Sequence, residues 1–413
     1  MSELKHLKGY WKDIFSCMGC GDCGYAIRPA VGRYLTCAVK EAKGEEGFEL
    51  TFSRGRMNVL KSVLVGQIPL SRELAEWVYQ CSECGNCSEV CHITQNENIL
   101  LPTCQWIDHV KVWDALRKDL VEAGFAPIER HNQLLDYMLN NSMRNPYGEY
   151  TDSKFGWVKE FPEINEKGEF VFFGGCTLPL RQVETLKSMM RILKASGKNI
   201  AFSKDEWCCG SIILRIGDEK SILEYINHNI EIFKNLGAKT IFTACAGCYR
   251  TWKKDYPEIL GTELPFEVKH ITEILVELLR NNQIPFNYTN AEPIKVTYHD
   301  PCHLGRHMGL YEIPRELISK IPGVELIEMK RTKQNAWCCG AGGGVKSQFP
   351  DLALNISKER IKEAIETGAK ILTTSCPFCI GNLSDAYESL ESEEKNKIKV
   401  IDILDLIASK LKF

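Results

Sequence analysis

The sequence predicts an α+β protein of several domains, in which a mainly helical region precedes two copies of one α/β unit. Three observations support this prediction. The chain has 413 residues, a length that at roughly 150 residues per domain suits two or three domains. Its 19 cysteines fall into three zones, at 17–104, 176–248 and 302–379. The last two zones repeat each other, which indicates a duplication.

Turn-forming stretches separate the three zones. Residues 140–150 read Asn-Asn-Ser-Met-Arg-Asn-Pro-Tyr-Gly-Glu-Tyr, and residues 281–293 contain two prolines and four asparagines. Such composition is typical of loops and linkers. We therefore expect three domains, at residues 1–149, 150–290 and 291–413.

Apart from its cysteines, the chain has the composition of an ordinary globular protein. Its 51 basic and 54 acidic side chains give a net charge of -3, which argues against binding to nucleic acid or to an anionic membrane surface. The sequence begins without an apolar signal stretch, and no run reaches the roughly 18 apolar residues of a membrane span. We expect a cytoplasmic protein, in which thiols stay reduced unless they bind metal or carry out redox chemistry.

The first region has helix-forming composition, with apolar residues three and four positions apart. This spacing predicts helices near Met57–Val65, Glu73–Gln80, Trp106–Leu120 and Gln133–Leu139. We therefore expect this region to be mainly helical.

Seven cysteines of the first region have the spacing of iron-sulfur ligands. Cys81, Cys84, Cys87 and Cys91 form C-x2-C-x2-C-x3-C, in which three thiolates bind one [4Fe-4S] cubane and the fourth usually reaches a neighbouring cubane. The three-ligand half recurs at Cys17, Cys20 and Cys23. Paired C-x2-C motifs also bind zinc, but three cysteines at two-residue gaps, present twice, favour cubanes.

The eighth cubane ligand is ambiguous, because the next cysteine follows Cys23 by fourteen positions. In the crossed pattern of two-cluster proteins, Cys91 completes the first cubane and Cys37 completes the second. Cys104 is the competing candidate for the role of Cys37. The predicted sets are Cys17, Cys20, Cys23 and Cys91 for one cubane, and Cys81, Cys84, Cys87 and Cys37 for the other.

The duplicated element is a motif of five cysteines. It reads C-x31-CCG-x34-CxxC in the first copy and C-x35-CCG-x35-CxxC in the second. Five thiolates exceed what one cubane or one zinc ion uses. The glycines after the cysteine pairs, Gly210 and Gly340, let the backbone pass close to a bound group. The paired positions are Cys176 with Cys302, Cys208 with Cys338, Cys209 with Cys339, Cys245 with Cys376, and Cys248 with Cys379.

Each copy of the motif follows short apolar, β-rich runs. Phe170–Phe173 and Val296–Tyr298 precede the first cysteine, whereas Thr240–Thr243 and Ile371–Thr374 precede the CxxC. Alternation of such runs with helical segments predicts parallel α/β units. The cysteines would then lie at the carboxyl ends of strands, where ligand sites of open α/β sheets occur.

With these motifs, the chain resembles the D subunit of the heterodisulfide reductase family, which fuses a two-cluster helical ferredoxin module to two CCG domains. The resemblance implies four [4Fe-4S] clusters, two cubane and two non-cubane. It also implies that the ten repeated cysteines hold the non-cubane clusters on either side of a disulfide substrate. Arg54-Gly55-Arg56 resembles a signature of the same family, for which we expect a structural role.

The function that this resemblance implies is the two-electron reduction of a small disulfide, or the reverse oxidation of thiols. Electrons would come from a redox partner subunit, such as a flavoprotein, a hydrogenase or ferredoxin-type donor, or a membrane cytochrome b through which the chain would associate with a membrane. The alternative is an electron-transfer subunit of a flavin-dependent lactate, glycolate or glycerol-3-phosphate dehydrogenase, or of an electron-transfer flavoprotein complex. Two intact five-cysteine motifs favour the first function.

A histidine next to one predicted ligand is a candidate proton donor. His303 follows Cys302 directly, and the unperturbed pKa of histidine suits proton transfer to a leaving thiolate. Hydrogen bonding to a cluster sulfur or to the loop backbone is the alternative role.

Overall fold

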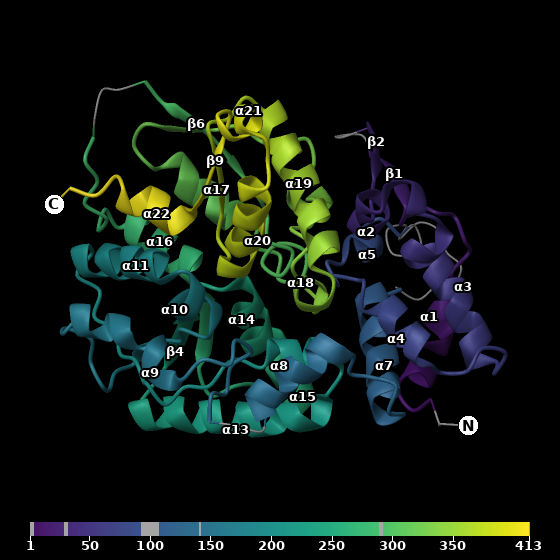
Figure 1. The fold of residues 1–413 in the computed structure, drawn as a ribbon. Coiled ribbons are helices and arrows are strands. Elements are labelled where there is room, and N and C mark those ends of the chain that lie inside the picture. Colours follow the sequence, from purple (N-terminus) through teal and green to yellow (C-terminus); the bar gives the residue numbers. More distant parts are fainter. Residues whose placement is uncertain (1–3, 29–31, 92–106, 140–141, 289–291, 413) are drawn as a thin grey trace, which may run out of the picture. The chain divides into compact units, whose positions relative to one another are not determined.

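A computed structural model describes most of the chain (Figure 1). Its residues form two compact units, each assembled from three segments of sequence. The described residues are 4–28, 32–91, 107–139, 142–288 and 292–412. The first unit comprises 1–133, 212–220 and 330–360, and the second comprises 134–211, 221–329 and 361–413.

The first unit is mainly helical, as the sequence predicts, and it also contains a hairpin of two strands. Its helices are α1 (Trp11–Ser16), α2 (Ala38–Ala42), α3 (Ser53–Leu64), α4 (Arg72–Val78), α5 (Asn86–Glu89), α7 (His109–Glu122) and α18 (Val345–Gln348), with the 3-10 helices η1 (Leu7–Tyr10), η2 (Gly44–Glu46), η3 (Glu49–Thr51) and η6 (Lys333–Asn335). The antiparallel hairpin joins β1 (Tyr25–Arg28) to β2 (Gly32–Leu35). This hairpin was not predicted, because four-residue strands are too short to show a period in the sequence.

Four further helices contribute residues to both units. They are α8 (Glu129–Leu139), α12 (Ser211–Ile216), α13 (Glu219–Leu236) and α19 (Pro350–Glu366). Among the described residues, we find no helix that is both long enough and apolar enough to cross a bilayer.

The second unit contains two parallel sheets, one from each copy of the repeat. The first sheet has the order β3-β4-β5 and the second β7-β6-β8-β9. Every neighbouring pair in these sheets is parallel, which confirms the predicted α/β units. The strands are β3 (Phe170–Phe172), β4 (Thr240–Thr243), β5 (Glu267–His270), β6 (Ile294–Tyr298), β7 (Val324–Leu326), β8 (Ile371–Thr374) and β9 (Lys399–Asp402).

Helices connect the strands of the second unit. They are α9 (Thr151–Lys154), α10 (Thr177–Arg181), α11 (Val183–Ala195), α14 (Ala246–Arg250), α15 (Tyr256–Leu260), α16 (Ile271–Arg280), α17 (Glu312–Ser319), α20 (Pro377–Glu388), α21 (Ser392–Lys395) and α22 (Ile403–Ala408), with the 3-10 helix η4 (Gly156–Glu160) and the π-helix η5 (Thr251–Asp255). The apolar face of α16 shows how such a helix is specified, since Ile271, Ile274, Leu275 and Leu278 are buried at helical spacing. Burying each such side chain contributes about 2 kcal/mol.

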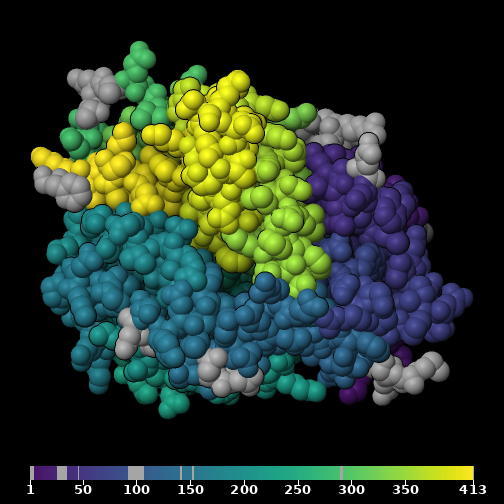
Figure 2. All heavy atoms as spheres, viewed as in Figure 1, coloured from purple at the N-terminus to yellow at the C-terminus, as the bar shows by residue number. Residues whose placement is uncertain are grey.

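The two repeats pack through equivalent helices in a reciprocal way. Helix α16 follows the last strand of the first sheet and packs against α17 of the second repeat, while α22 follows the last strand of the second sheet and packs against α11 of the first. Thr185 donates a hydrogen bond of 2.6 Å to Asp405 at the second contact. Figure 2 shows the yellow C-terminal residues directly against the teal residues of the first repeat. Reciprocal contacts of this kind are the mark of a local two-fold axis.

Candidate metal centres

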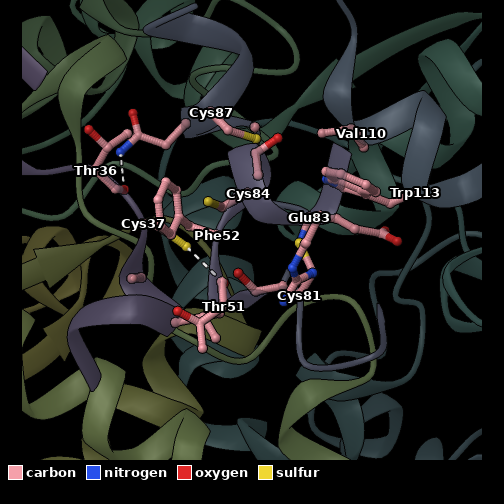
Figure 3. Close-up of a pocket in the computed structure, with 17 residues that line it drawn as sticks. Thr36, Cys37, Thr51, Phe52, Cys81, Glu83, Cys84, Cys87, Val110 and Trp113 are labelled. Atoms are coloured by element: carbon pink, nitrogen blue, oxygen red, sulfur yellow. Dashed lines mark hydrogen bonds between the residues drawn. The ribbon is translucent and has the colours of Figure 1, made fainter. Parts of the chain in front are cut away.

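Four cysteines from two separate motifs of the first unit line one cavity (Figure 3). Cys37 follows the end of the hairpin, Cys81 and Cys84 lie in the loop between α4 and α5, and Cys87 lies on α5 itself. Figure 3 shows their sulfurs around the shared space, beside Phe52 and Trp113. Cys104 lies outside the described residues. The structure therefore brings together the four thiols that the crossed ligand pattern predicts for the second cubane.

The segment that carries three of these thiols, formed by the α4–α5 loop and the start of α5, is held by a hydrogen bond and by left-handed backbone. Gly85 has φ 77°, a conformation that glycine adopts without strain. Asn86 on α5 donates a hydrogen bond of 2.9 Å to the carbonyl of Thr36. This bond ties the loop to the residue that precedes Cys37, so both halves of the ligand set are fixed to each other.

Burial disfavours free thiolates in this cavity. It raises the pKa of Cys37 to about 11 and also raises the pKa of Cys81, while the nearby Arg56 is the largest opposing influence on both. Burial likewise raises the pKa of Cys87, and the neighbouring Cys81 raises it further. These thiols need a cation to become thiolates at neutral pH, and a coordinating metal ion supplies one.

The first cysteine motif surrounds the start of α3. The backbone N–H of Arg54 donates to the Cys23 sulfur at 3.1 Å, and Lys61 donates to the Cys17 carbonyl at 2.9 Å. Cys20 is exposed. Cys91 is buried in a hydrophobic core that Cys17 also borders. N–H donation to sulfur is typical of iron-sulfur loops, where it raises the reduction potential.

All five cysteines of the first repeat are buried in the second unit. Cys176 follows β3 and Cys245 follows β4, which confirms their prediction at the carboxyl ends of parallel strands. The Cys208 sulfur lies 3.5 Å from that of Cys176. Hydrogen bonds from Cys208 and then Cys248 lower the pKa of Cys209. The five thiols thus form one connected group that fits a multi-thiolate metal centre.

The adjacent cysteines of this repeat are fixed through their backbone. Asn229 on α13 donates to the Cys208 carbonyl at 3.2 Å and accepts from the Trp207 N–H at 2.9 Å. Tyr256 on α15 donates to the Cys209 carbonyl at 2.8 Å. Gly210, the glycine that follows, has φ 71°. These contacts fix the backbone of the pair and therefore the directions in which its two sulfurs point.

The cysteines of the second repeat are divided between the two units. Cys302, Cys376 and Cys379 belong to the second unit. The loop before Cys302 is anchored by Arg315, which donates to both oxygens of Asp300 at 2.7 Å and 2.9 Å. Cys376 directly precedes α20, two residues after β8, as predicted.

Cys338 and Cys339 belong to the first unit, together with the glycine-rich segment that follows them. Gly340 has φ 86°, and a β-carbon built there lies 2.6 Å from the Ala353 carbonyl oxygen, so only glycine fits this position. The hydroxyl of Ser82 lies 3.3 Å from the Cys338 sulfur. Because Ser82 follows Cys81, this contact joins the second cubane motif to the cysteine pair of the second repeat.

Equivalent cysteines of the two repeats meet within the second unit. The thiols of Cys245 and Cys376 are neighbours: Cys248 lowers the pKa of Cys245, but Cys376 and burial together raise it well above its usual value. His303 lies at the same junction, where its Nε2 is 3.3 Å from Nη1 of Arg250 on α14. Since a guanidinium only donates, the Nε2 of His303 is the acceptor in this contact. Its role as a proton donor remains a prediction.

Sequence reasoning missed three residues at these sites, namely Ser82, Arg250 and Arg117. Ser82 and Arg250 lie within or just after cysteine motifs, so a search of residues between ligands could have found them. Arg117 lies on α7, 26 positions after Cys91, and donates to the Cys81 carbonyl at 2.8 Å. No local pattern signals that contact.

Comparison with known proteins identifies the duplicated domain. The model of the CCG cysteine-rich domain matches residues 170–253 and 296–384. These ranges fall inside the second and third predicted domains, whose exact boundaries remain predictions.

Similar proteins include components of redox enzymes. The chain is 40% identical over 364 residues to the D subunit of dihydromethanophenazine:CoB–CoM heterodisulfide reductase of Methanosarcina barkeri, covering 85% of this chain and 83% of that protein. It is 32% identical over 332 residues to the B subunit of fumarate reductase (CoM/CoB) of Methanothermobacter marburgensis, covering 80% and 61%. A crystal structure of a hypothetical protein from Helicobacter pylori shares the fold, with TM-score 0.53, 11% identity, and coverage of 83% and 64%.

Proposed function

The chain belongs to the family of the heterodisulfide reductase D subunit, whose members are iron-sulfur oxidoreductases, and we propose that it reduces a disulfide, or oxidises two thiols in the reverse direction. The chemistry takes place between the two five-cysteine motifs. Each motif binds one non-cubane [4Fe-4S] cluster, and the first domain binds two cubanes. The substrate is a small disulfide that the junction of the repeats admits.

The observation that carries this proposal is the proximity of Cys245 to Cys376, whose thiol raises the pKa of Cys245. These residues hold the same position in the two repeats, and equivalent residues meet only at a local two-fold axis. A centre that includes Cys245 would therefore lie next to one that includes Cys376. A disulfide has two equivalent sulfurs, so a paired site suits it better than a single site does.

The reaction balances with two electrons and two protons. The S–S bond breaks, each sulfur receives one electron, and each resulting thiolate takes one proton. When bound, the iron-sulfur clusters would supply single electrons and Lewis acidity. The ten cysteines of the repeats would fix where this happens, and the buried Tyr256 holds the Cys209 carbonyl through its hydroxyl.

The cubane motifs form the path by which electrons enter. Cys20 is exposed, which suits a first centre that exchanges electrons with a partner protein. Cys37, Cys81, Cys84 and Cys87 hold the second centre, and Ser82 links it to Cys338. The partner is a redox protein that donates single electrons, namely a flavoprotein, a ferredoxin-type donor or a membrane cytochrome b.

The metal content of protein purified anaerobically tests this proposal. We expect iron and acid-labile sulfide near sixteen of each per chain, at about four per cluster. Zinc in place of iron, or iron for only two clusters, contradicts the proposal. Four clusters without any reaction with thiols or disulfides leave the chain as an electron-transfer subunit.

A further inference from the structure

Arg56 is a buried arginine that has no carboxylate partner among the described residues. Arg56 lies on α3, and its exposed fraction is 2%. It lines the cavity of Cys37, Cys81, Cys84 and Cys87. Within the part of the chain that the structure describes, its Nε and Nη1 atoms have no hydrogen-bond partner. The rings of Trp77 and Trp113 lie 5.3 Å and 5.9 Å from the guanidinium carbon and provide only weak cation–π contacts.

Two other buried arginines of this unit have carboxylate partners. Arg117 pairs with Glu83, and Arg215 pairs with Asp114 at 3.3 Å. Taking an ion out of water costs several kcal/mol, which only a well-placed counter-charge offsets. The buried guanidinium of Arg56 therefore indicates an anion inside the cavity that it faces.

A cluster bound by four thiolates is an anion that meets this requirement. Its sulfurs accept hydrogen bonds, and reduction adds one negative charge to it. A buried cation at close range stabilises the more negative, reduced form, and charge and hydrogen bonds to sulfur are established determinants of cluster potential. Low solvent exposure leaves this effect unscreened.

The first cubane motif has no comparable buried arginine within the described ranges. Its nearest arginine, Arg54, forms an ion pair with Glu49, and the Arg54 side chain is 31% exposed. Paired and partly solvated, this guanidinium contributes little net field. The two cubane sites therefore differ in electrostatics although their motifs are alike.

We propose that Arg56 sets the reduction potential of the cluster held by Cys37, Cys81, Cys84 and Cys87, raising it above that of the first cubane. Arg56 is a tuning residue, which acts on the cluster without taking part in bond breaking. This inference rests on the proposed function, since it requires a cluster at that site. Its consequence is that an electron accepted at the first cubane moves on to the second.

The test is a redox titration of the full-length, cluster-loaded protein, followed by electron paramagnetic resonance. The reduction wave that Cys81→Ser abolishes belongs to this cluster. Arg56→Gln removes the charge, whereas Arg56→Lys keeps it. Arg72→Gln is the matched control, because Arg72 is exposed on α4 and pairs with Glu76.

We expect Arg56→Gln to lower the equilibrium constant for reduction of this cluster at least tenfold, which is 59 mV for one electron. Arg56→Lys should restore most of the loss, and Arg72→Gln should change nothing. An unchanged potential in Arg56→Gln overturns the inference and leaves the proposed function standing. Loss of this cluster from both Arg56 variants also overturns the inference, because Arg56 would then be needed for assembly of the cluster and not for its potential. A wild-type protein without the wave overturns the proposed function itself.

Discussion

Cys245 of the first repeat lies beside Cys376, its counterpart in the second, and the thiol of Cys376 raises the pKa of Cys245. Both residues open a CxxC motif, and both directly precede a helix, α14 or α20. The reciprocal packing of α11 with α22 and of α16 with α17 has the same symmetry. The duplicated sequence has therefore folded into two halves that present the same cysteine to each other, which is the geometry that a substrate with two like sulfurs requires.

The eighth cubane ligand can be decided by two substitutions. We expect Cys37→Ser to remove about four irons per chain, a full cluster, because Cys37 lines the same cavity as Cys81, Cys84 and Cys87. Cys104→Ser should keep the wild-type iron content. Iron analysis of both variants measures the outcome, and the opposite pattern would assign the ligand to Cys104.

The contact between Ser82 and Cys338 predicts an effect on electron transfer between motifs. The Ser82 hydroxyl, 3.3 Å from the Cys338 sulfur, stabilises a metal-bound thiolate by about 1.5 kcal/mol, as a hydrogen bond to a charged group does. Ser82→Ala should therefore lower the equilibrium constant for reduction of the cluster that Cys338 binds roughly tenfold, a fall in potential of about 59 mV. Redox titration measures the shift, and the exposed Ser319→Ala is the control. Equal potentials in the wild type and in Ser82→Ala would show that the Ser82 hydroxyl does not influence this cluster.

Arg117 holds the second cubane loop in place, and its loss should destabilise the first unit. The guanidinium is fully buried, pairs with Glu83, and donates to the carbonyls of Cys81, Arg215 and Gly343 at 2.8 Å, 2.6 Å and 3.1 Å. Breaking a buried ion pair on one side costs about 3–5 kcal/mol. Arg117→Gln should lower the free energy of unfolding by that amount in urea denaturation.

The control for this substitution is Arg72→Gln, which removes an exposed arginine of the same unit. Surface pairs of this kind contribute about 0.5 kcal/mol. If both variants unfold at the same urea concentration, the Arg117 network does not stabilise the loop.

A buried histidine predicts that the first unit loses stability in mild acid. Burial lowers the pKa of His131 to about 4, and its Nε2 lies 3.0 Å from the Gly344 carbonyl oxygen. Between pH 6.5 and 4 the unfolded chain therefore binds a proton that the folded chain does not, so stability falls as the pH falls through this window. The full effect is on the order of 3 kcal/mol. His131→Gln should unfold with a weaker pH dependence between pH 7 and 5, and an unaltered slope would contradict this prediction.

Much of the fold follows from local sequence signals. The strands before the cysteines were predictable because buried parallel strands are short, apolar and rich in β-branched residues, as Thr240–Thr243 and Ile371–Thr374 are. The predicted helix near Met57–Val65 is observed as α3, Ser53–Leu64, with a start that lies earlier because the polar residues Ser53 and Arg54 carry no periodic signal.

The long-range contacts could not be predicted in the same way. The approach of Cys37 to the loop of Cys81 depends on the hydrogen bond between Asn86 and Thr36, which are 50 residues apart. The burial of Arg56 could not be predicted either. Arg54 and Arg56 are the same residue type two positions apart, but they lie on different faces of α3, and only Arg56 is buried. Only the fold distinguishes the exposed, paired arginine from the one that faces the cavity.

The rate of disulfide reduction tests the central claim most directly. A one-electron chemical reductant supplies electrons to the anaerobic, cluster-loaded protein, and thiol release is measured for the wild type, Cys209→Ala and Cys339→Ala. We predict that each substitution lowers the rate about 100-fold or more, a barrier increase of about 2.7 kcal/mol, while the cubane signals remain. Unchanged turnover in both variants would contradict catalysis at the paired five-cysteine sites.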